Sequence, residues 1–138
     1  MTTNRDYACA IVIDTLGRLL LQQRDDIPGI AFPGKIGLFG GDLEDDETFL
    51  QCVVREVNEE IGCHIPPERF QYLCGQRTTA KGEYFVVRGV PVEAVTVTEG
   101  SLVIAEIKDL PSLAQRLVPT AYEAIRRFII QQSQQNSS

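Results

Sequence analysis

The fold class and the chemistry of this chain are decided by residues 41–63, which read Gly41-Asp-Leu-Glu-Asp-Asp-Glu47-Thr-Phe-Leu-Gln-Cys-Val-Val-Arg55-Glu56-Val-Asn-Glu59-Glu60-Ile-Gly62-Cys63. Glu56, Glu59 and Glu60 stand at positions i, i+3 and i+4, which an α-helix places on one stripe. Like charges at this spacing cost an isolated helix about 0.2–0.5 kcal/mol per pair. A hard cation such as Mg²⁺, which binds oxygen ligands, would offset the repulsion. The stretch therefore indicates metal-assisted chemistry.

The same stretch predicts the limits of a helix. We expect it to begin near Asp45 or Asp46, because acidic residues suit the positive end of a helix dipole. Gly62 is a natural C-terminal stop. The predicted apolar stripe consists of Leu50, Val53, Val54, Val57 and Ile61. On a helical wheel Glu56 and Glu60 lie at the edge of this stripe, which weakens the alternative of a purely solvated acidic face.

The bulk properties are those of a globular protein with one core. The chain has 138 residues, of which 43% are hydrophobic and 23% charged. Its net charge of −6 argues against nucleic acid as a bulk partner. We find neither a signal-peptide core nor an apolar run of about 18 residues, so we expect no membrane partner and a soluble, cytoplasmic protein. We expect its cysteines to stay reduced and mostly buried.

The remaining segments predict one mixed α/β domain over residues 1–138. The expected strands cover residues 7–13, 18–24, 36–39, 70–76, 84–90 and 102–107. The first two strands should form a β-hairpin, and the Pro- and Gly-containing residues 25–37 an irregular loop. A second amphipathic helix is expected over residues 120–131, followed by a polar, frayed tail over 131–138.

The stretch that begins at Gly41 resembles the signature of the Nudix hydrolase family, G-x5-E-x7-R-E-U-x-E-E-x-G-U, where U is aliphatic. Every invariant position is filled, and Cys63 stands where an aliphatic residue is usual. The order of segments along nearly the whole chain resembles the Nudix α/β/α sandwich with a mixed β-sheet. Two departures leave the substrate open: Phe39-Gly40-Gly41 replaces the frequent Pro-Gly-Gly, and Ile36 replaces a common aromatic residue.

The resemblance implies a site for Mg²⁺ or Mn²⁺. The expected ligands are the carboxylates of Glu56, Glu59 and Glu60 and the carbonyl of Gly40. A salt bridge between Glu47 and Arg55 would fix the geometry of loop and helix, with Gly41 and Gly62 as structural positions of the motif.

Three residues outside the core of the signature are candidates for the same site. Glu99 resembles the later-loop acid that often completes it, and a water-exposed turn acid is an equal alternative. Arg24 could clamp a phosphate, with an ordinary surface arginine as the alternative. Phe39 is expected to contact the substrate.

The implied reaction is metal-dependent hydrolysis of a diphosphate bond in a nucleoside diphosphate linked to another moiety X. Metal ions would neutralise charge and activate water, and a carboxylate would accept the proton. Glu56 is the first choice for this base, Glu59 the second, and Glu99 competes with both. Arg55 completes the predicted catalytic set.

The expected partner is a small nucleotide derivative, an NDP-sugar or a (d)NTP, and a homodimer stays open. One alternative function is a Nudix-like nucleotide-binding or regulatory domain without turnover. Another is an isomerase on the same fold, for which we find no suitably placed Cys/Glu pair.

Overall fold

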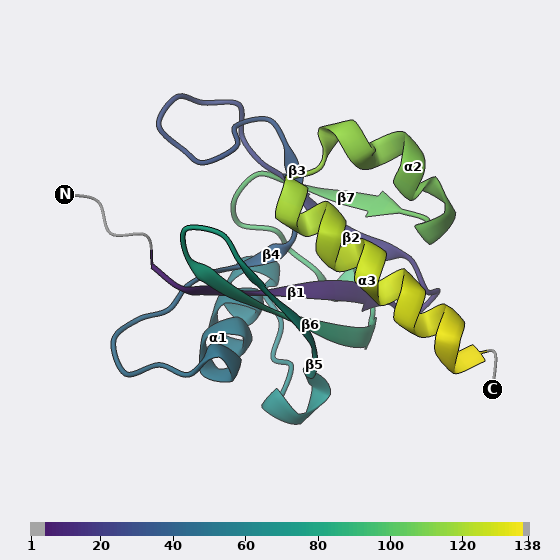
Figure 1. The fold of residues 1–138 in the computed structure, drawn as a ribbon, viewed down its shortest axis with the longest axis horizontal. Helices are drawn as coiled ribbons and strands as arrows, with labels where there is room; N and C mark the ends of the chain where they lie inside the picture. Colours follow the sequence, from purple (N-terminus) through teal and green to yellow (C-terminus); the bar gives the residue numbers. More distant parts are fainter. Residues whose placement is uncertain (1–4, 137–138) are drawn as a thin grey trace.

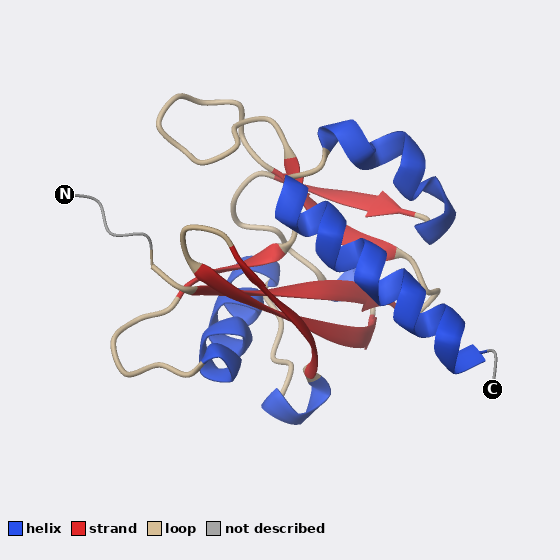
Figure 2. Cartoon of the chain, viewed as in Figure 1, coloured by secondary structure: helices blue, strands red, loops and turns tan. Residues whose placement is uncertain are grey.

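The chain folds into three layers, which the computed structural model describes for residues 5–136. A mixed β-sheet is the middle layer, with α1 (Phe49–Ile61) on one face and α3 (Pro119–Asn136) across the other (Figure 1, Figure 2). The short helix α2 (Leu110–Leu113) precedes α3. Further 3-10 turns are η1 (Pro67–Arg69), η2 (Val92–Ala94), η3 (Ile107–Asp109) and η4 (Ala114–Arg116). Within residues 5–136 no helix is long and apolar enough to cross a membrane.

The sheet contains seven strands among the described residues. They are β1 (Tyr7–Asp14), β2 (Leu19–Gln23), β3 (Ile36–Gly37), β4 (Phe39–Asp42), β5 (Gln71–Arg77), β6 (Lys81–Val90) and β7 (Ser101–Ala105). The strand order is β3-β2-β1-β6-β5, with β4 paired to β1 and β7 paired to β2. Strand β1 is parallel to β6 and antiparallel to β2 and β4. The predicted mixed sheet and its N-terminal hairpin are therefore confirmed.

Strand β1 contributes to the hydrophobic core on both faces, because successive side chains of a strand point to opposite sides. Ile11 and Ile13 pack in the core beneath α3, together with Phe128. Ala10 and Val12 pack in the core beneath α1. The central strand thus joins the two helical layers.

One edge of β1 is shared between two partners. Its first half, from Tyr7 to Ala10, pairs with β4, whereas Val12 and Ile13 pair with β2. The prediction of a single strand over residues 36–39 is therefore wrong. Strand β3 pairs with β2 and β4 pairs with β1, and the chain passes from one partner to the other at Leu38.

Helix α1 begins at Phe49 rather than near Asp45 or Asp46. Thr48 is the N-cap: its hydroxyl accepts from the Gln51 amide at 3.1 Å, and its own amide donates to the Gln51 side chain at 2.9 Å. This reciprocal capping box satisfies two backbone donors at the start of the helix and fixes its first residue as Phe49. The C-terminal stop is at Gly62, which adopts the left-handed conformation with φ 67°.

The apolar face of α1 differs from the predicted stripe at its first position. Leu50 is 39% exposed, so its expected place in the core is wrong. The side chains that face the sheet are Cys52, Val53, Val57 and Ile61. Within the first turn of the helix, Cys52 faces the sheet and Leu50 faces outward.

Helix α3 extends further than expected. It begins at Pro119 and continues to Asn136 rather than ending near Gln131, so residues 131–136 of the expected tail are helical. Glutamine is a good helix former, which explains why a polar sequence sustains the helix. Residues 137–138 of the expected tail lie outside the described part of the chain.

The four cysteines are all free, as expected for reduced thiols. Only Cys52 is fully buried, whereas Cys9, Cys63 and Cys74 are partly exposed. The expectation that most of them are buried is therefore wrong.

The capping box makes a testable contribution to stability. Replacing Thr48 with Ala removes the side-chain acceptor, and the free energy of unfolding in urea should fall by about 0.5–2 kcal/mol. Thr48→Ser is the control, because it keeps the hydroxyl and should stay close to the wild type. A Ser variant as unstable as the Ala variant would contradict this role of the hydroxyl.

Candidate functional site

Two carboxylates of α1 lie against the paired glycines of β4. The Gly40 amide donates a hydrogen bond to Glu60 Oε2 at 2.8 Å. At Gly41, an added Cβ would lie 2.5 Å from the carboxyl carbon of Glu56. At Gly40, an added Cβ would lie 2.2 Å from the Ala8 carbonyl oxygen. The Glu56 carboxylate therefore has its space because residue 41 has no side chain, and the missing side chain at residue 40 lets β4 lie against β1.

The environment opposes the negative charge of both carboxylates. Burial raises the pKa of Glu60 to about 8, despite the hydrogen bond from the Gly40 amide, and the nearby carboxylates of Glu56 and Glu99 raise it further. Burial also raises the pKa of Glu56, although Arg55 partly offsets this effect. A bound cation would relieve both penalties, because an opposite charge favours the ionised form.

Arg55 connects the start of the helix to the site. Its Nε and Nη2 donate to the two carboxylate oxygens of Glu47 at 2.7 and 2.9 Å, so the predicted salt bridge is confirmed. Its Nη1 donates to Glu56 Oε1 at 2.8 Å. The hydrogen bond from Arg55, helped by one from the Glu44 amide, lowers the pKa of Glu47 to about 2. Arg55 thereby fixes both the preceding loop and the orientation of Glu56.

The third glutamate of the signature does not join the other two. The side chain of Glu59 is 64% exposed, and its nearest cation is Arg55 Nη1 at 3.8 Å. Among residues 5–136, no group of three or more His, Cys, Asp or Glu side chains is arranged to hold a metal ion. The predicted three-carboxylate site is therefore not preassembled, and Glu59 would have to turn toward Glu56 and Glu60 to complete it.

Arg24 and Glu99 lie close enough to Glu60 for their charges to act on it. The Glu99 carboxylate raises the pKa of Glu60, whereas the Arg24 guanidinium lowers it. The Glu99 turn is held by Gln22, whose side chain donates to the Glu99 carbonyl at 3.0 Å. Both predicted residues therefore lie at the same end of the sheet as the α1 carboxylates. Gln22 was missed, because its partner is 77 positions away and leaves no local signal.

Phe39 lies in the core rather than at the surface of the site. Its side chain has 0% exposure and packs among the residues beneath α1, including Val53 and Val57. Ile36, at the other departure from the family pattern, is equally buried. The expected contact between the Phe39 side chain and a substrate is therefore wrong, because the ring already fills the core.

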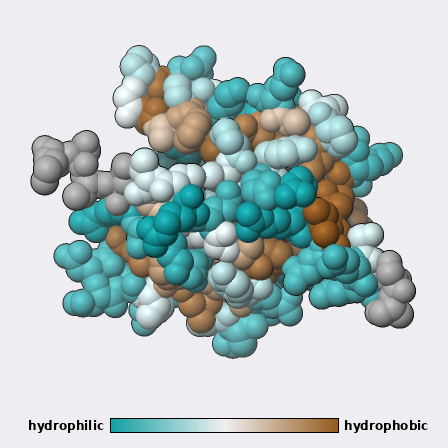
Figure 3. Space-filling view, viewed as in Figure 1, coloured by the Kyte–Doolittle hydropathy of each residue, from teal (hydrophilic) through white to brown (hydrophobic). Residues whose placement is uncertain are grey.

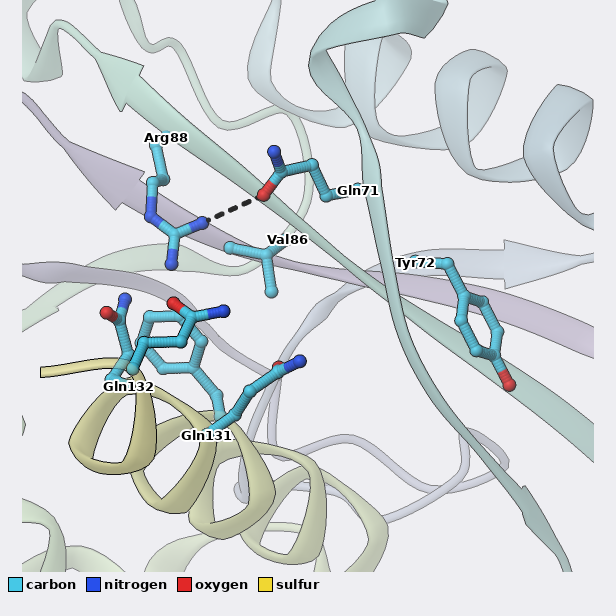
Figure 4. A pocket seen from close by; sticks show the side chains of 8 residues that line it. Gln71, Tyr72, Val86, Arg88, Gln131 and Gln132 are labelled. Carbon is cyan, nitrogen blue, oxygen red and sulfur yellow. Dashed lines mark hydrogen bonds between the residues drawn. The ribbon is translucent and has the colours of Figure 1, made fainter. Parts of the chain in front are cut away.

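A cavity of about 380 Å³ lies elsewhere, between β5, β6 and α3 (Figure 4). The residues that line it are Gln71, Tyr72, Val86, Arg88, Phe128, Gln131, Gln132 and Gln135. Arg88 donates to the side-chain oxygen of Gln71 at 3.2 Å and stacks 5.2 Å from the centre of the Phe128 ring. No carboxylate lines this cavity, so its chemistry differs from that of the α1 site.

Comparison with known proteins gives consistent likenesses. A family model described as NUDIX domain matches residues 3–128. A MutT protein from Methanosarcina mazei Go1 has a TM-score of 0.73 and 23% identity, over 93% of this chain and 94% of that one. A MutT NUDIX hydrolase from Burkholderia pseudomallei has a TM-score of 0.68 and 25% identity, over 89% and 96%. A search of curated protein sequences gives no match.

A third structure is that of a larger protein. It is a bifunctional NMN adenylyltransferase/ADP ribose pyrophosphatase from Francisella tularensis, complexed with AMP and an Mn ion. The TM-score is 0.72 with 18% identity, over 96% of this chain but only 42% of that chain. This chain therefore spans less than half of the bifunctional protein. Together these structures confirm the predicted α/β/α sandwich with a mixed sheet.

The Glu47–Arg55 pair predicts a pH-dependent contribution to stability. Because the pKa of Glu47 is lowered from 4.5 to about 2, its stabilisation is present above pH 4.5 and is lost as the pH falls toward 2. The thermal midpoint of Glu47→Gln should therefore lie below that of the wild type at pH 7. The difference should shrink when both proteins are measured down to pH 3. Glu93→Gln is the control, since this exposed acid has no ion pair among the described residues, and an equal loss there would contradict the assignment.

Proposed function

The chain belongs to the Nudix family, and we propose that this hydrolase cleaves the diphosphate bond of a nucleoside diphosphate linked to another group. The reaction would use a divalent metal held by α1. The observation that carries the proposal is the pair Glu56 and Glu60, which lies against Gly40 and Gly41 with the charge of both carboxylates opposed by burial.

The donor set suits Mg²⁺ or Mn²⁺. Glu56 and Glu60 offer carboxylate oxygens, which these hard cations prefer, and the Gly40 carbonyl is a further candidate ligand. Glu59, on the adjoining helical position, would complete the set after a side-chain rotation. When bound, the metal would neutralise the charge of the diphosphate and activate the attacking water. The Mn ion in the Francisella tularensis complex supports this choice of metal.

The remaining residues have distinct proposed tasks. Glu56 is the first candidate for the base, because a raised pKa suits proton acceptance near neutral pH and Arg55 fixes its orientation. Glu59 is the second candidate, since its exposed side chain is free to turn. Arg55 acts as a positioning residue through Glu56 and Glu47. Glu99 competes as base or serves as an added ligand from its turn.

Arg24 is the proposed phosphate contact. Its Nε donates to the Ala31 carbonyl at 2.7 Å, and its Nη groups have no hydrogen bond within the described residues. A guanidinium fork with free donors matches the oxygens of a phosphate. Its charge already acts on Glu60, so a phosphate bound there would lie beside the proposed metal ligands.

The proposed substrate is a small nucleotide derivative, and NDP-sugars and (d)NTPs are the candidate classes. Four free thiols suit the reducing cytoplasm, which is the proposed location. The one observation that favours the alternative of a binding domain without turnover is the outward position of Glu59.

A substrate screen tests the proposal directly. NDP-sugars, dinucleotides and (d)NTPs are incubated with Mg²⁺ or Mn²⁺, and phosphate is measured after treatment of the products with a phosphatase. At least one class should be cleaved only when the metal is present. Binding of nucleotides without cleavage of any of them would support the binding-domain alternative instead.

Substitution of the α1 glutamates tests the residue assignments. We expect Glu56→Gln and Glu60→Gln to lower kcat by about 100-fold or more, the range of acid–base and metal-ligand losses. Glu68→Gln, in the exposed turn η1, should stay within about twofold of the wild type. Because burial opposes the charge of Glu60, Glu60→Gln should keep the thermal midpoint measured without metal. An inactive Glu60→Gln that also unfolds at lower temperature would point to a structural role.

The close approach of β4 to α1 gives a second test. Gly41→Ala would force the Glu56 carboxylate out of its position, and kcat/KM should fall about 10- to 100-fold, as for a misplacement of about 1 Å. Gly37→Ala is the matched control in β3, since its Cβ would meet its nearest atom, in Val118, at 3.6 Å, an ordinary contact. Equal losses in both variants would contradict the specific role of the Gly41 contact.

A further inference from the structure

Residues 25–35, which we call the Phe32 loop, connect β2 to β3 and expose two large apolar side chains. Phe32 is 50% exposed and Ile27 is 52% exposed. The loop projects beyond β3 at the upper left of the molecule (Figure 1) and carries a brown, hydrophobic patch in the space-filling view (Figure 3). Two exposed large apolar side chains on one loop make this loop a candidate binding surface.

Hydrogen bonds fix the Phe32 loop at its neck and across its middle. At the neck, the Arg24 amide donates to the Lys35 carbonyl at 2.9 Å, and the Gly34 amide donates to the Asp25 carbonyl at 3.1 Å. Across the loop, Arg24 Nε donates to the Ala31 carbonyl at 2.7 Å. The loop therefore presents its side chains in a defined arrangement.

The backbone at Phe32 is strained. Its φ of 50° lies in the left-handed region, which bulky residues rarely adopt. Pro33 follows directly, and a residue before proline is normally restricted to extended conformations. The Lys35 amide donates to the Phe32 carbonyl at 3.2 Å, which closes a turn over Pro33 and Gly34. Strain of this kind collects at functional positions, where the surrounding structure enforces it.

Arg24 links this ring to the α1 carboxylates. Its guanidinium binds the carbonyl of Ala31, the residue that precedes Phe32. Arg24 directly follows β2, which pairs with β3, and the chain runs from β3 through Leu38 to Gly40, whose amide donates to Glu60 at 2.8 Å. Because Arg24 contacts the Phe32 loop directly, a nucleotide whose phosphates bind at Arg24 would have the loop within reach of its base.

We propose that the Phe32 ring stacks on the base of the nucleotide substrate, which makes Phe32 a specificity-determining residue of the site. The proposal rests on the proposed function, because it takes the phosphates to lie at the α1 carboxylates. Aromatic rings stack on the face of any base, so Phe32 selects for a base-bearing diphosphate rather than for one particular base. Arg24 holds the loop through its Nε and keeps its Nη donors for the phosphates.

The test compares ATP with ribose 5-triphosphate, which lacks the base, in the wild type, Phe32→Ala, Phe32→Tyr and Ile27→Ala. For Phe32→Ala, the ratio of kcat/KM for ATP to that for ribose 5-triphosphate should fall about 5- to 150-fold, the equivalent of the roughly 1–3 kcal/mol of one stacked base. Phe32→Tyr should restore the ratio. Both substitutions keep a Cβ at φ 50°, so the backbone strain is unchanged.

Ile27→Ala is the matched control, since it removes an equally exposed apolar side chain from the same loop. An unchanged ratio in Phe32→Ala, or an equal fall in Ile27→Ala, overturns the stacking role. The proposed function fails separately if the screen of NDP-sugars, dinucleotides and (d)NTPs finds no cleavage. If the wild type hydrolyses neither ATP nor ribose 5-triphosphate, binding of α,β-methylene-ATP is measured instead. The stacking role then requires that Phe32→Ala raises the dissociation constant for α,β-methylene-ATP by about 5- to 150-fold. The stacking role is overturned if the wild type does not bind this compound or if the substitution leaves the dissociation constant unchanged.

Discussion

The structure depends on the close approach of β4 to α1 on one side and to β1 on the other, which only residues without side chains allow. A Cβ at Gly41 would lie 2.5 Å from the Glu56 carboxyl carbon, and one at Gly40 would lie 2.2 Å from the Ala8 carbonyl oxygen. Two hydrogen bonds cross the contact between β4 and α1, from the Cys52 thiol to the Gly41 carbonyl at 3.2 Å and from the Gly40 amide to Glu60 at 2.8 Å. This contact half-buries two carboxylates, and their burial is what makes the site favourable for a cation.

Arg55 hydrogen-bonds to two of the acidic side chains of the family signature, Glu47 and Glu56, and leaves Glu60 without a hydrogen bond from its guanidinium. It neutralises Glu47 through two hydrogen bonds and orients Glu56 through a third, so these residues hold the loop and the helix together. Glu60 receives only a backbone amide, and its neighbour Glu99 adds negative charge. Glu60 therefore lacks a side-chain cation of its own among the described residues, and burial keeps its pKa high.

The sequence predicted those features that depend on local spacing. The position of Glu56 and Glu60 at the edge of the apolar stripe followed from helical periodicity, and the Glu47–Arg55 pair followed from the family resemblance. The Thr48 cap was readable as a T-x-x-Q capping box, but the acidic residues before it suggested an earlier start. The burial of Phe39 and the division of residues 36–42 between two partner strands depend on pairing with β1 and β2, which local sequence does not encode. The same holds for Gln22 and Glu99, which meet only after β7 pairs with β2.

The central claim is that Glu56 and Glu60, held against Gly40 and Gly41, form the metal site of this Nudix hydrolase. A crystal grown with Mn²⁺ and measured for anomalous scattering tests it most directly. We expect an anomalous peak within bonding distance of both carboxylates, with Glu59 turned toward it from its exposed position. A peak confined to the acidic loop over residues 42–46, or no peak beside α1 at saturating Mn²⁺, would contradict it.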